Sequence, residues 1–271
     1  MPHIDVPGAR LYYESDGQAS APALLLIHAG VANLRMWDPL IDVLARDHHV
    51  IRYDTRGFGQ TASEDVTFSD RDDARHVLDH LGVNAATVIG CSRGGGIAID
   101  VTVETPERVR GLVTIGSGPS GFPDVELTDE EDAFFDRLDA AYGARDWPVL
   151  GRLSAEYWSI GASRSAEQLD PAFVRTAYEL ARPNAARSRE RPIAQPLEPP
   201  AYDRVVDIEV PALITVGEFD VSEALAQQAY LVHAIPDAAG YIFSDTAHIP
   251  SVEHPDEFLQ VLTGWLAEHQ L

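Results

Sequence analysis

The sequence is poor in three features that mark particular classes of protein: cysteine, lysine and long apolar runs. Its single cysteine, Cys91, excludes an internal disulfide and any metal site built from several cysteines. No stretch is long and apolar enough to cross a membrane. The first residues, Met1 to Asp5, lack the basic and apolar regions of a signal peptide, so the expected location is the cytoplasm.

Lysine is absent altogether, and the 20 basic residues, all arginines, stand against 43 acidic ones. The net charge of −23 predicts an acidic surface that repels nucleic acid and anionic membranes, so neither is expected as a partner. Solubility with a compositional bias against lysine is one explanation of this charge, and a halophilic origin is the alternative; the charge says nothing about the substrate. The expected partner is a small molecule, and the oligomeric state stays open.

Short apolar runs alternate with segments of helical spacing over most of the 271 residues. Strands are predicted at residues 4–6, 11–13, 23–27, 50–53, 87–89, 109–115, 212–216 and 241–243. Helices are predicted at residues 36–44, 70–81, 97–105, 222–234 and 255–266. Alternation of this kind predicts a mostly parallel sheet with helices on both faces, a doubly wound α/β fold.

The alternation stops between residues 122 and 207, where helical segments follow one another without strands. These segments cover residues 130–142, 149–158 and 171–181. We therefore expect a core domain made of residues 1–121 and 208–271, with a helical cap, residues 122–207, inserted after the sixth strand. Substrate choice is expected to lie in the cap, where Trp147, Tyr157 and Trp158 are candidates for lining a pocket, although aromatic residues at helical spacing are more often core.

A Gly-x-Ser-x-Gly pattern, residues 90–94, connects the predicted strand 87–89 to the helix that follows. Strand, sharp turn and helix in this order form the context of a nucleophile elbow, in which the central serine, Ser92, stands at the tip. The two outer glycines leave space for the tight turn. Cys91 is also a nucleophile by chemistry, but its position next to the tip predicts a small buried apolar residue.

A serine hydroxyl needs a base to accept its proton, and the base needs a carboxylate to orient it. In elbow-type enzymes the carboxylate and then the histidine follow the serine along the chain. Asp220 ends a Gly-x-x-Asp segment after one predicted strand, and His248 follows the last strand. Glu218 is the alternative acid, and nine other histidines compete with His248.

The chain resembles the α/β-hydrolase superfamily, in particular its small capped members. The matching segments, in chain order, are His28-Ala29-Gly30, Asp54-Thr55-Arg56-Gly57-Phe58-Gly59, Gly90-Cys91-Ser92-Arg93-Gly94-Gly95, Gly217-Glu218-Phe219-Asp220, and Ala247-His248-Ile249-Pro250 with Glu253-His254-Pro255. The resemblance implies that Ser92 is the nucleophile, Asp220 the acid and His248 the base. It covers nearly the whole chain except the cap.

A tetrahedral oxyanion needs two main-chain donors. The amide of Arg93, directly after the nucleophile, is expected to be one. By resemblance the other is the amide of Gly30, with Val31 as the alternative because this chain has His-Ala where the family usually has His-Gly. His28 is expected to shape this loop, and the Arg93 side chain to pair with an acid or to meet an anionic substrate group.

The resemblance implies a hydrolase that cleaves small carboxylic esters or lactones through an acyl-enzyme, similar to enol-lactone hydrolases and carboxylesterases. The same three residues also suit carbon–carbon cleavage of a β-diketone or a cofactor-free perhydrolase reaction. A slow-turnover ligand-binding protein is the third alternative. The predicted mechanism requires neither a metal nor an organic cofactor.

Overall fold

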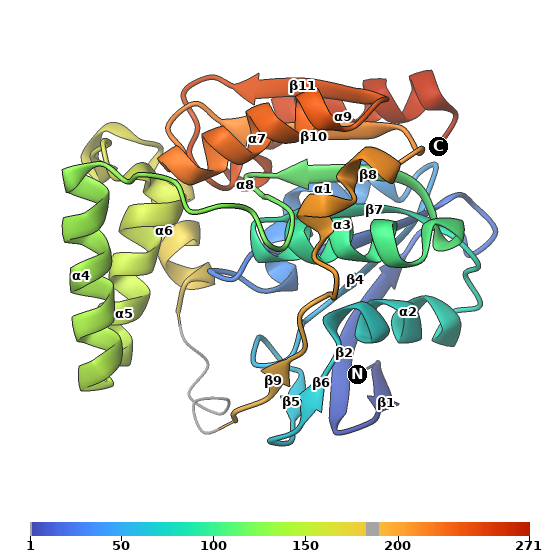
Figure 1. Cartoon of the computed structure of the whole chain (residues 1–271), viewed down its shortest axis with the longest axis horizontal. Helices are drawn as coiled ribbons and strands as arrows, with labels where there is room; N and C mark the ends of the chain where they lie inside the picture. The colour runs from blue at the N-terminus through green and yellow to red at the C-terminus, as the bar shows by residue number, and fades with distance from the viewer. Residues whose placement is uncertain (1, 183–189) are drawn as a thin grey trace.

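The computed structural model describes residues 2–182 and 190–271. Within this part of the chain nine strands form one sheet (Figure 1). Their spatial order is β1 (His3–Val6), β2 (Ala9–Asp16), β4 (His49–Tyr53), β3 (Ala23–Ile27), β7 (Ala86–Cys91), β8 (Val109–Ile115), β10 (Ala212–Gly217) and β11 (Ala238–Phe243), with β5 (Ala62–Ser63) beside β2. All pairs from β4 to β11 are parallel, whereas β1, β2 and β5 pair antiparallel. The prediction of a mostly parallel sheet is confirmed.

Helices cover both faces of the sheet. One face carries α2 (Asp70–His80), α3 (Arg93–Glu104) and α7 (Ser222–Ala234), and the other carries the 3-10 turn η1 (Leu34–Trp37), α1 (Asp38–Leu44), α8 (Pro250–Glu253) and α9 (Pro255–His269). The central strands are apolar on both sides because Leu25 and Val88 face the first set while Leu26 and Ile89 face the second. The sheet is therefore a rigid platform buried on both faces.

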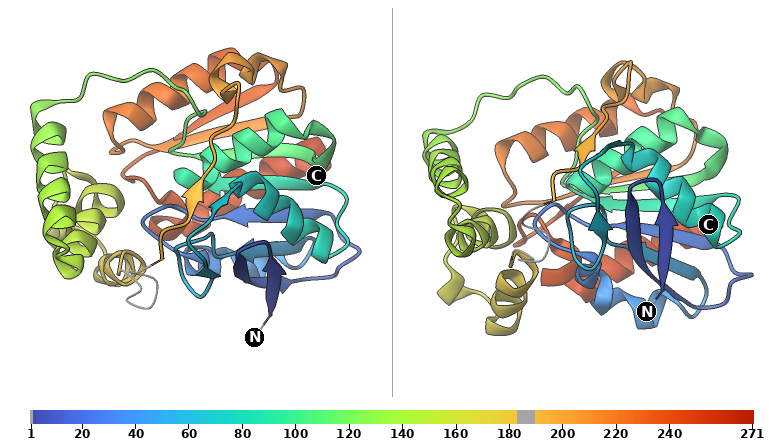
Figure 2. Two further views of the ribbon diagram at one scale, coloured as in Figure 1. Left: turned by 60° about the horizontal axis from the view of Figure 1, so that its bottom comes forward. Right: turned by 90° about the horizontal axis from the view of Figure 1, so that it is seen from below.

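Further helices stand at the end of the sheet where the parallel strands finish (Figures 1 and 2). They are α4 (Asp129–Ala144), α5 (Trp147–Ser154), the π-helix η3 (Ala155–Gly161), the 3-10 turn η4 (Ala166–Gln168) and α6 (Pro171–Leu180). We call residues 129–180 the helical layer. The helix predicted over 149–158 is found, but it changes to a π-helix at Ala155. Among the described residues, no helix combines the length and the apolar character needed to cross a membrane.

The end of the segment 122–207 contacts the core outside the nine-stranded sheet. The short strand β9 (Ile193–Ala194) pairs with β6 (Thr67–Phe68) in a separate two-stranded sheet. The remaining described elements are three 3-10 turns, η2 (Pro106–Arg108), η5 (Ala201–Asp203) and η6 (Val205–Asp207). Ala201 and Val205 are buried in the core cluster that contains α3. Ala201 and Val205, near the end of the segment 122–207, therefore belong to the packed core, and residues 183–189 lie outside the described ones.

A buried ion pair fixes the loop that follows β4. The Nε and Nη2 atoms of Arg56 donate to the two carboxylate oxygens of Asp73 on α2 over 2.7 and 2.8 Å, and Nη2 also donates to the carbonyl of Pro7. Both side chains are at most 3% exposed. The pair thus ties the β4 loop to a helix and to the β1–β2 hairpin.

Replacing Asp73 by alanine should lower the free energy of unfolding by about 3 to 5 kcal/mol, because the Arg56 charge would stay buried without a partner. The matched control is Asp5→Ala, which removes the partner of Arg10 in an exposed ion pair and should cost less than about 1 kcal/mol. Urea unfolding of both variants measures the difference. Equal losses of unfolding free energy in Asp73→Ala and Asp5→Ala would contradict the role of the buried Arg56–Asp73 pair.

Candidate active site

Ser92 occupies the turn between β7 and α3, with φ of 53° and ψ of −122°. A serine at positive φ is strained, and such strain clusters at functional turns. The flanking glycines are required by space. A Cβ atom on Gly90 would lie 2.2 Å from the carbonyl oxygen of Gly94, and one on Gly94 would lie 2.2 Å from that of Ile27. The turn therefore has the steric requirement that the sequence pattern predicts.

Asp220 and His248 meet beyond the ends of β10 and β11. The Nδ1 atom of His248 lies 2.8 and 2.9 Å from the two carboxylate oxygens of Asp220. Both side chains are at most 2% exposed. Glu218, the alternative acid, instead accepts a hydrogen bond from the amide of Asp245. The structure therefore brings Asp220, and not Glu218, to the histidine.

Ser92 and His248 line one cavity of about 230 Å³. Asp220 holds Nδ1, and the other ring nitrogen, Nε2, is buried without a hydrogen-bond partner among the described residues. The indole of Trp158 packs on the imidazole with ring centroids 4.8 Å apart. Within the described chain, no hydrogen bond joins Ser92 to His248. The two residues line the same cavity without being hydrogen-bonded to each other.

The main-chain donors predicted for an oxyanion lie on either side of the same turn. Arg93 is the first residue of α3, so its amide has no acceptor within the helix. A Cβ atom on Gly30 would lie 3.7 Å from Cβ of Arg93, which places the loop after β3 against the elbow. In the described residues, no intramolecular hydrogen bond engages the amides of Gly30 and Val31. Both amides thus remain candidates for the second donor.

The Arg93 side chain turns toward an acid. Its guanidinium donates to the carboxylate of Asp70 over 2.8 Å and to the hydroxyl of Thr55 over 2.7 Å, and it lies over the ring of Phe58. Of the two expectations for this side chain, the structure shows pairing with an acid. Asp70 lies 23 residues upstream, at the start of α2, so no local pattern identifies it.

Cys91 is a buried residue beside the elbow. Its thiol donates to the carbonyl of His248 over 3.4 Å. Burial, with a further contribution from the charge of Asp220, raises the pKa of the Cys91 thiol well above its ordinary value. A thiol that stays protonated is a poor nucleophile, so Cys91 supports the backbone of His248 and offers no rival nucleophile.

His28 connects the loop after β3 to the loop after β4. Its Nδ1–H donates to the carbonyl of Ala29 over 2.8 Å, and its Nε2 accepts the amide of Thr55 over 3.0 Å. Complete burial, assisted by the nearby Arg93 charge and opposed by the bond to Ala29, lowers the pKa of His28 to about 3. The imidazole is therefore neutral near pH 7 and shapes the loop that carries Gly30.

The helical layer contacts the loops of Asp220 and His248 in three places. The carbonyl of Trp158 accepts the amide of His248. Glu131 on α4 accepts hydrogen bonds from the amide and the hydroxyl of Ser222, two residues after Asp220. Arg164 of this layer forms a buried ion pair with Glu253, which also accepts the amide of Ala247, the residue before His248. The layer is therefore part of what positions the Asp220–His248 pair.

Sequence reasoning missed Glu131, Arg164 and Glu253 as supports of the site. A signal for Glu131 is present, because Thr128-Asp129-Glu130-Glu131 is a capping-box sequence and the structure shows both of its hydrogen bonds. That signal predicts only the start of α4 and not the contact with Ser222. Nothing local indicates the ion pair, whose partners are 89 residues apart.

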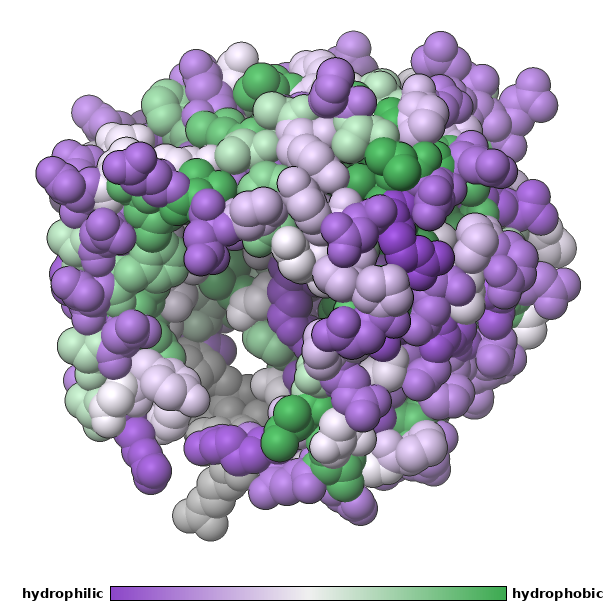
Figure 3. Space-filling model, in the orientation of Figure 1, coloured by the Kyte–Doolittle hydropathy of each residue, from purple (hydrophilic) through white to green (hydrophobic). Residues whose placement is uncertain are grey.

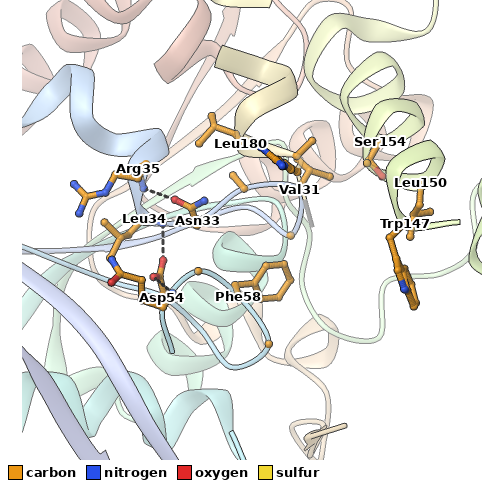
Figure 4. A pocket seen from close by; sticks show the side chains of 18 of the residues that line it. Val31, Asn33, Leu34, Arg35, Asp54, Phe58, Trp147, Leu150, Ser154 and Leu180 are labelled. Atoms are coloured by element: carbon orange, nitrogen blue, oxygen red, sulfur yellow. Dashed lines mark hydrogen bonds between the residues drawn. The ribbon is translucent and has the colours of Figure 1, made fainter. Parts of the chain in front are cut away.

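A larger hollow of about 580 Å³ opens between the helical layer and the loops after β3 and β4 (Figure 3). Figure 4 shows Val31 and Phe58 on one side, with Trp147 and Leu150 of α5 on the other. Of the three aromatic candidates, Trp147 lines this hollow, Trp158 lines the cavity at Ser92, and Tyr157 is buried. In the part of the chain that the structure describes, no group of three acidic, histidine or cysteine residues could hold a metal ion.

A parallel sheet with a strained serine turn after its central strand, followed in chain order by an aspartate–histidine pair, defines the class of α/β hydrolases. The sequence model of the alpha/beta hydrolase fold family matches residues 22–255. The chain belongs to this family and is a hydrolase.

Relatives and solved structures agree with this membership. RutD of Azorhizobium caulinodans, provisionally named a carbamate hydrolase, is 30% identical over 274 residues and 99% of both chains. The 2-hydroxy-6-oxononadienedioate/2-hydroxy-6-oxononatrienedioate hydrolase of Paraburkholderia phymatum is 30% identical, over 96% of this chain and 91% of its own. The crystal structure of the enol-lactonase from Burkholderia xenovorans LB400 matches with a TM-score of 0.78 at 23% identity, over 98% of this chain and 100% of the other.

The depressed pKa of His28 predicts a specific loss of stability in acid. An unfolded histidine binds its proton near pH 6.5, whereas the folded protein resists protonation of His28 until about pH 3. This contribution is complete above pH 6.5 and is lost as the pH falls, by at most about 1.4 kcal/mol per pH unit. His28→Gln should flatten the acid limb of the unfolding free energy, and the exposed His254→Gln should not. Parallel acid limbs for wild type and His28→Gln would contradict the burial of a neutral ring.

The Arg164–Glu253 pair predicts a coupled effect on stability. Glu253→Gln leaves a buried guanidinium without its counter-charge and should lower the free energy of unfolding by about 3 kcal/mol. Adding Arg164→Met removes that charge and should recover part of the loss. Denaturant unfolding of both single variants and the double variant forms the cycle. Strictly additive losses would show that the two side chains are not coupled.

Proposed function

We propose that the protein cleaves small carboxylic esters or lactones through an acyl-enzyme on Ser92, with His248 as base and Asp220 as its orienting acid. One observation carries the proposal. The Asp220–His248 pair presents an unpartnered ring nitrogen at the cavity that Ser92 also lines. A serine, a base and an orienting carboxylate in this arrangement are the parts that acyl transfer requires.

The mechanism follows from these positions. Ser92 attacks the substrate carbonyl while Nε2 of His248 accepts the hydroxyl proton. Asp220 accepts the Nδ1–H bond, which fixes the tautomer with a free Nε2 and stabilises the ring when it becomes charged. The amides of Arg93 and Gly30, or Val31 in its place, stabilise the oxyanion by about 3 kcal/mol for each donor. His248 then returns this proton to the departing alkoxide, which leaves as the alcohol while the acyl group stays on Ser92. Water, activated by His248, attacks the acyl-enzyme, and the carboxylic acid leaves as Ser92 takes its proton back.

The helical layer acts as a cap in this proposal. Its contacts with His248 and Ser222 hold the base and the loop of the acid, and its apolar side chains Trp147 and Leu150 face the larger hollow. A cover of this kind excludes water from the reacting groups and strengthens the electrostatic interactions inside. Substrate selection by the cap follows from this placement.

A second candidate reaction is cleavage next to a ketone in an oxo acid. The relative from Paraburkholderia phymatum is named as a hydrolase of a hydroxy-oxo-dienedioate, at 30% identity. The same serine, histidine and aspartate serve that chemistry, so their geometry does not separate the two reactions. Rates on matched substrates do.

Ser92→Ala should abolish hydrolysis of p-nitrophenyl acetate and of a simple γ-lactone, with kcat falling by up to about a millionfold toward the uncatalysed rate. Asp220→Asn should lower kcat by about ten-thousandfold, because the amide would favour the imidazole tautomer with its proton on Nε2, which cannot accept the Ser92 proton. Steady-state rates on an ester, a lactone and a β-diketone measure this.

The control is Ser117→Ala, a second serine of the same cavity whose hydroxyl is bound to the carbonyl of Ile115. This variant should keep its ester hydrolysis. Ester hydrolysis that survives Ser92→Ala would refute the mechanism. Turnover of the diketone without the esters would favour the second reaction, and binding without turnover of any substrate would favour a ligand-binding role.

A further inference from the structure

The cavity at Ser92 has an acidic wall. Ser92 and His248 form one side, and the beginning of α7 forms another, with Glu223 and Gln227 among its lining residues. Glu223 is the second residue of α7, three positions after Asp220. A carboxylate that is not part of the proposed mechanism therefore borders the space in which the reacting acyl group would lie.

Glu223 is held in place and is not a freely moving surface side chain. Nε2 of Gln227 donates to its Oε1 over 2.9 Å. Gln227 itself packs against the backbone of Gly118, where an added Cβ atom would lie 2.3 Å from Cδ of Gln227. The absence of a side chain at Gly118 thus gives Gln227 the room to brace Glu223 at the cavity wall.

Among the described residues, no free cation balances this negative charge. Arg93 is the only arginine among the described residues that line this cavity, and Asp70 and Thr55 already bind its guanidinium. Tyr157, packed beside Val221 and Ala224 at the same wall, reports the local field. Burial first, and then the charges of Glu131, Asp220 and Glu223, raise the pKa of its hydroxyl. The region around the cavity is therefore electronegative.

Building on the proposed function, we propose that Glu223 determines specificity by charge: it favours substrates whose acyl chain is uncharged and rejects those whose acyl chain carries a carboxylate. Two like charges a few ångströms apart in a partly desolvated cavity repel each other strongly. Both the ground state and the transition state of an anionic substrate would meet this repulsion, so it lowers kcat/KM.

The test compares two esters of equal chain length. p-Nitrophenyl hexanoate ends in a methyl group, and the mono-p-nitrophenyl ester of adipic acid ends in a carboxylate. Wild-type kcat/KM, corrected with Ser92→Ala, should favour the hexanoate by about tenfold or more, the factor expected for one unscreened charge pair. Glu223→Gln keeps the shape and the acceptor for Gln227, and it should reduce this preference by at least about fivefold. Glu268→Gln, an exposed change on α9 with the same effect on net charge, should leave the preference as it is.

The outcomes separate the two proposals. Equal wild-type rates on both esters, or a Glu223→Gln variant that changes both rates by the same factor, would overturn the role of Glu223 while leaving the serine mechanism standing. If the wild-type protein hydrolysed neither ester faster than Ser92→Ala does, the proposed function would be refuted instead. In that case the binding of hexanamide and of adipic acid monoamide, measured by NMR titration, tests the charge filter alone. Equal Kd values of the wild-type protein for hexanamide and for adipic acid monoamide would overturn the role of Glu223.

Discussion

The hydrogen bond between Asp220 and His248 is the interaction on which the site depends. It is buried, both carboxylate oxygens face Nδ1, and its direction leaves Nε2 toward the cavity of Ser92. Two neighbouring parallel strands, β10 and β11, bring the partners together at one edge of the sheet. Gly116 allows this closeness, because a Cβ atom there would lie 2.5 Å from Oδ2 of Asp220. A side chain at that position would push Asp220 away from His248.

The support of this bond comes from both halves of the fold. The loops of Asp220 and His248 begin at the ends of β10 and β11. The helical layer contacts these loops and α8 through Trp158, Glu131 and Arg164. Buried charged groups of this kind add little net stability, but a missing partner is costly, so they specify one arrangement over others. The helical layer therefore contacts the loops that carry Asp220 and His248, in addition to lining the cavity with Trp158.

Sequence predicted most of the sheet and the placing of Ser92, Asp220 and His248 after its strands, because these features rest on local patterns. Apolar runs indicate buried strands. The Gly-x-Ser-x-Gly pattern indicates the turn, because a side chain at Gly90 or Gly94 would collide with a backbone carbonyl. Spacing alone does not separate Asp220 from Glu218, which lie in one loop; the family resemblance favours Asp220, and the coordinates show it bound to His248. Three other features depend on tertiary packing, which hydrophobic periodicity does not encode. They are the pairing of Arg93 with Asp70, the burial of Ala201 and Val205 in the core, and the Arg164–Glu253 ion pair.

We propose, above all, that Ser92 is the activated nucleophile of the site. Treatment of the native protein with a fluorophosphonate, followed by peptide mass spectrometry, tests it without knowledge of the substrate. The account predicts one phosphonyl group per chain, located on Ser92, and none on Ser92→Ala or on unfolded protein. Stoichiometric labelling of another residue, or undiminished labelling of Ser92→Ala, would contradict it.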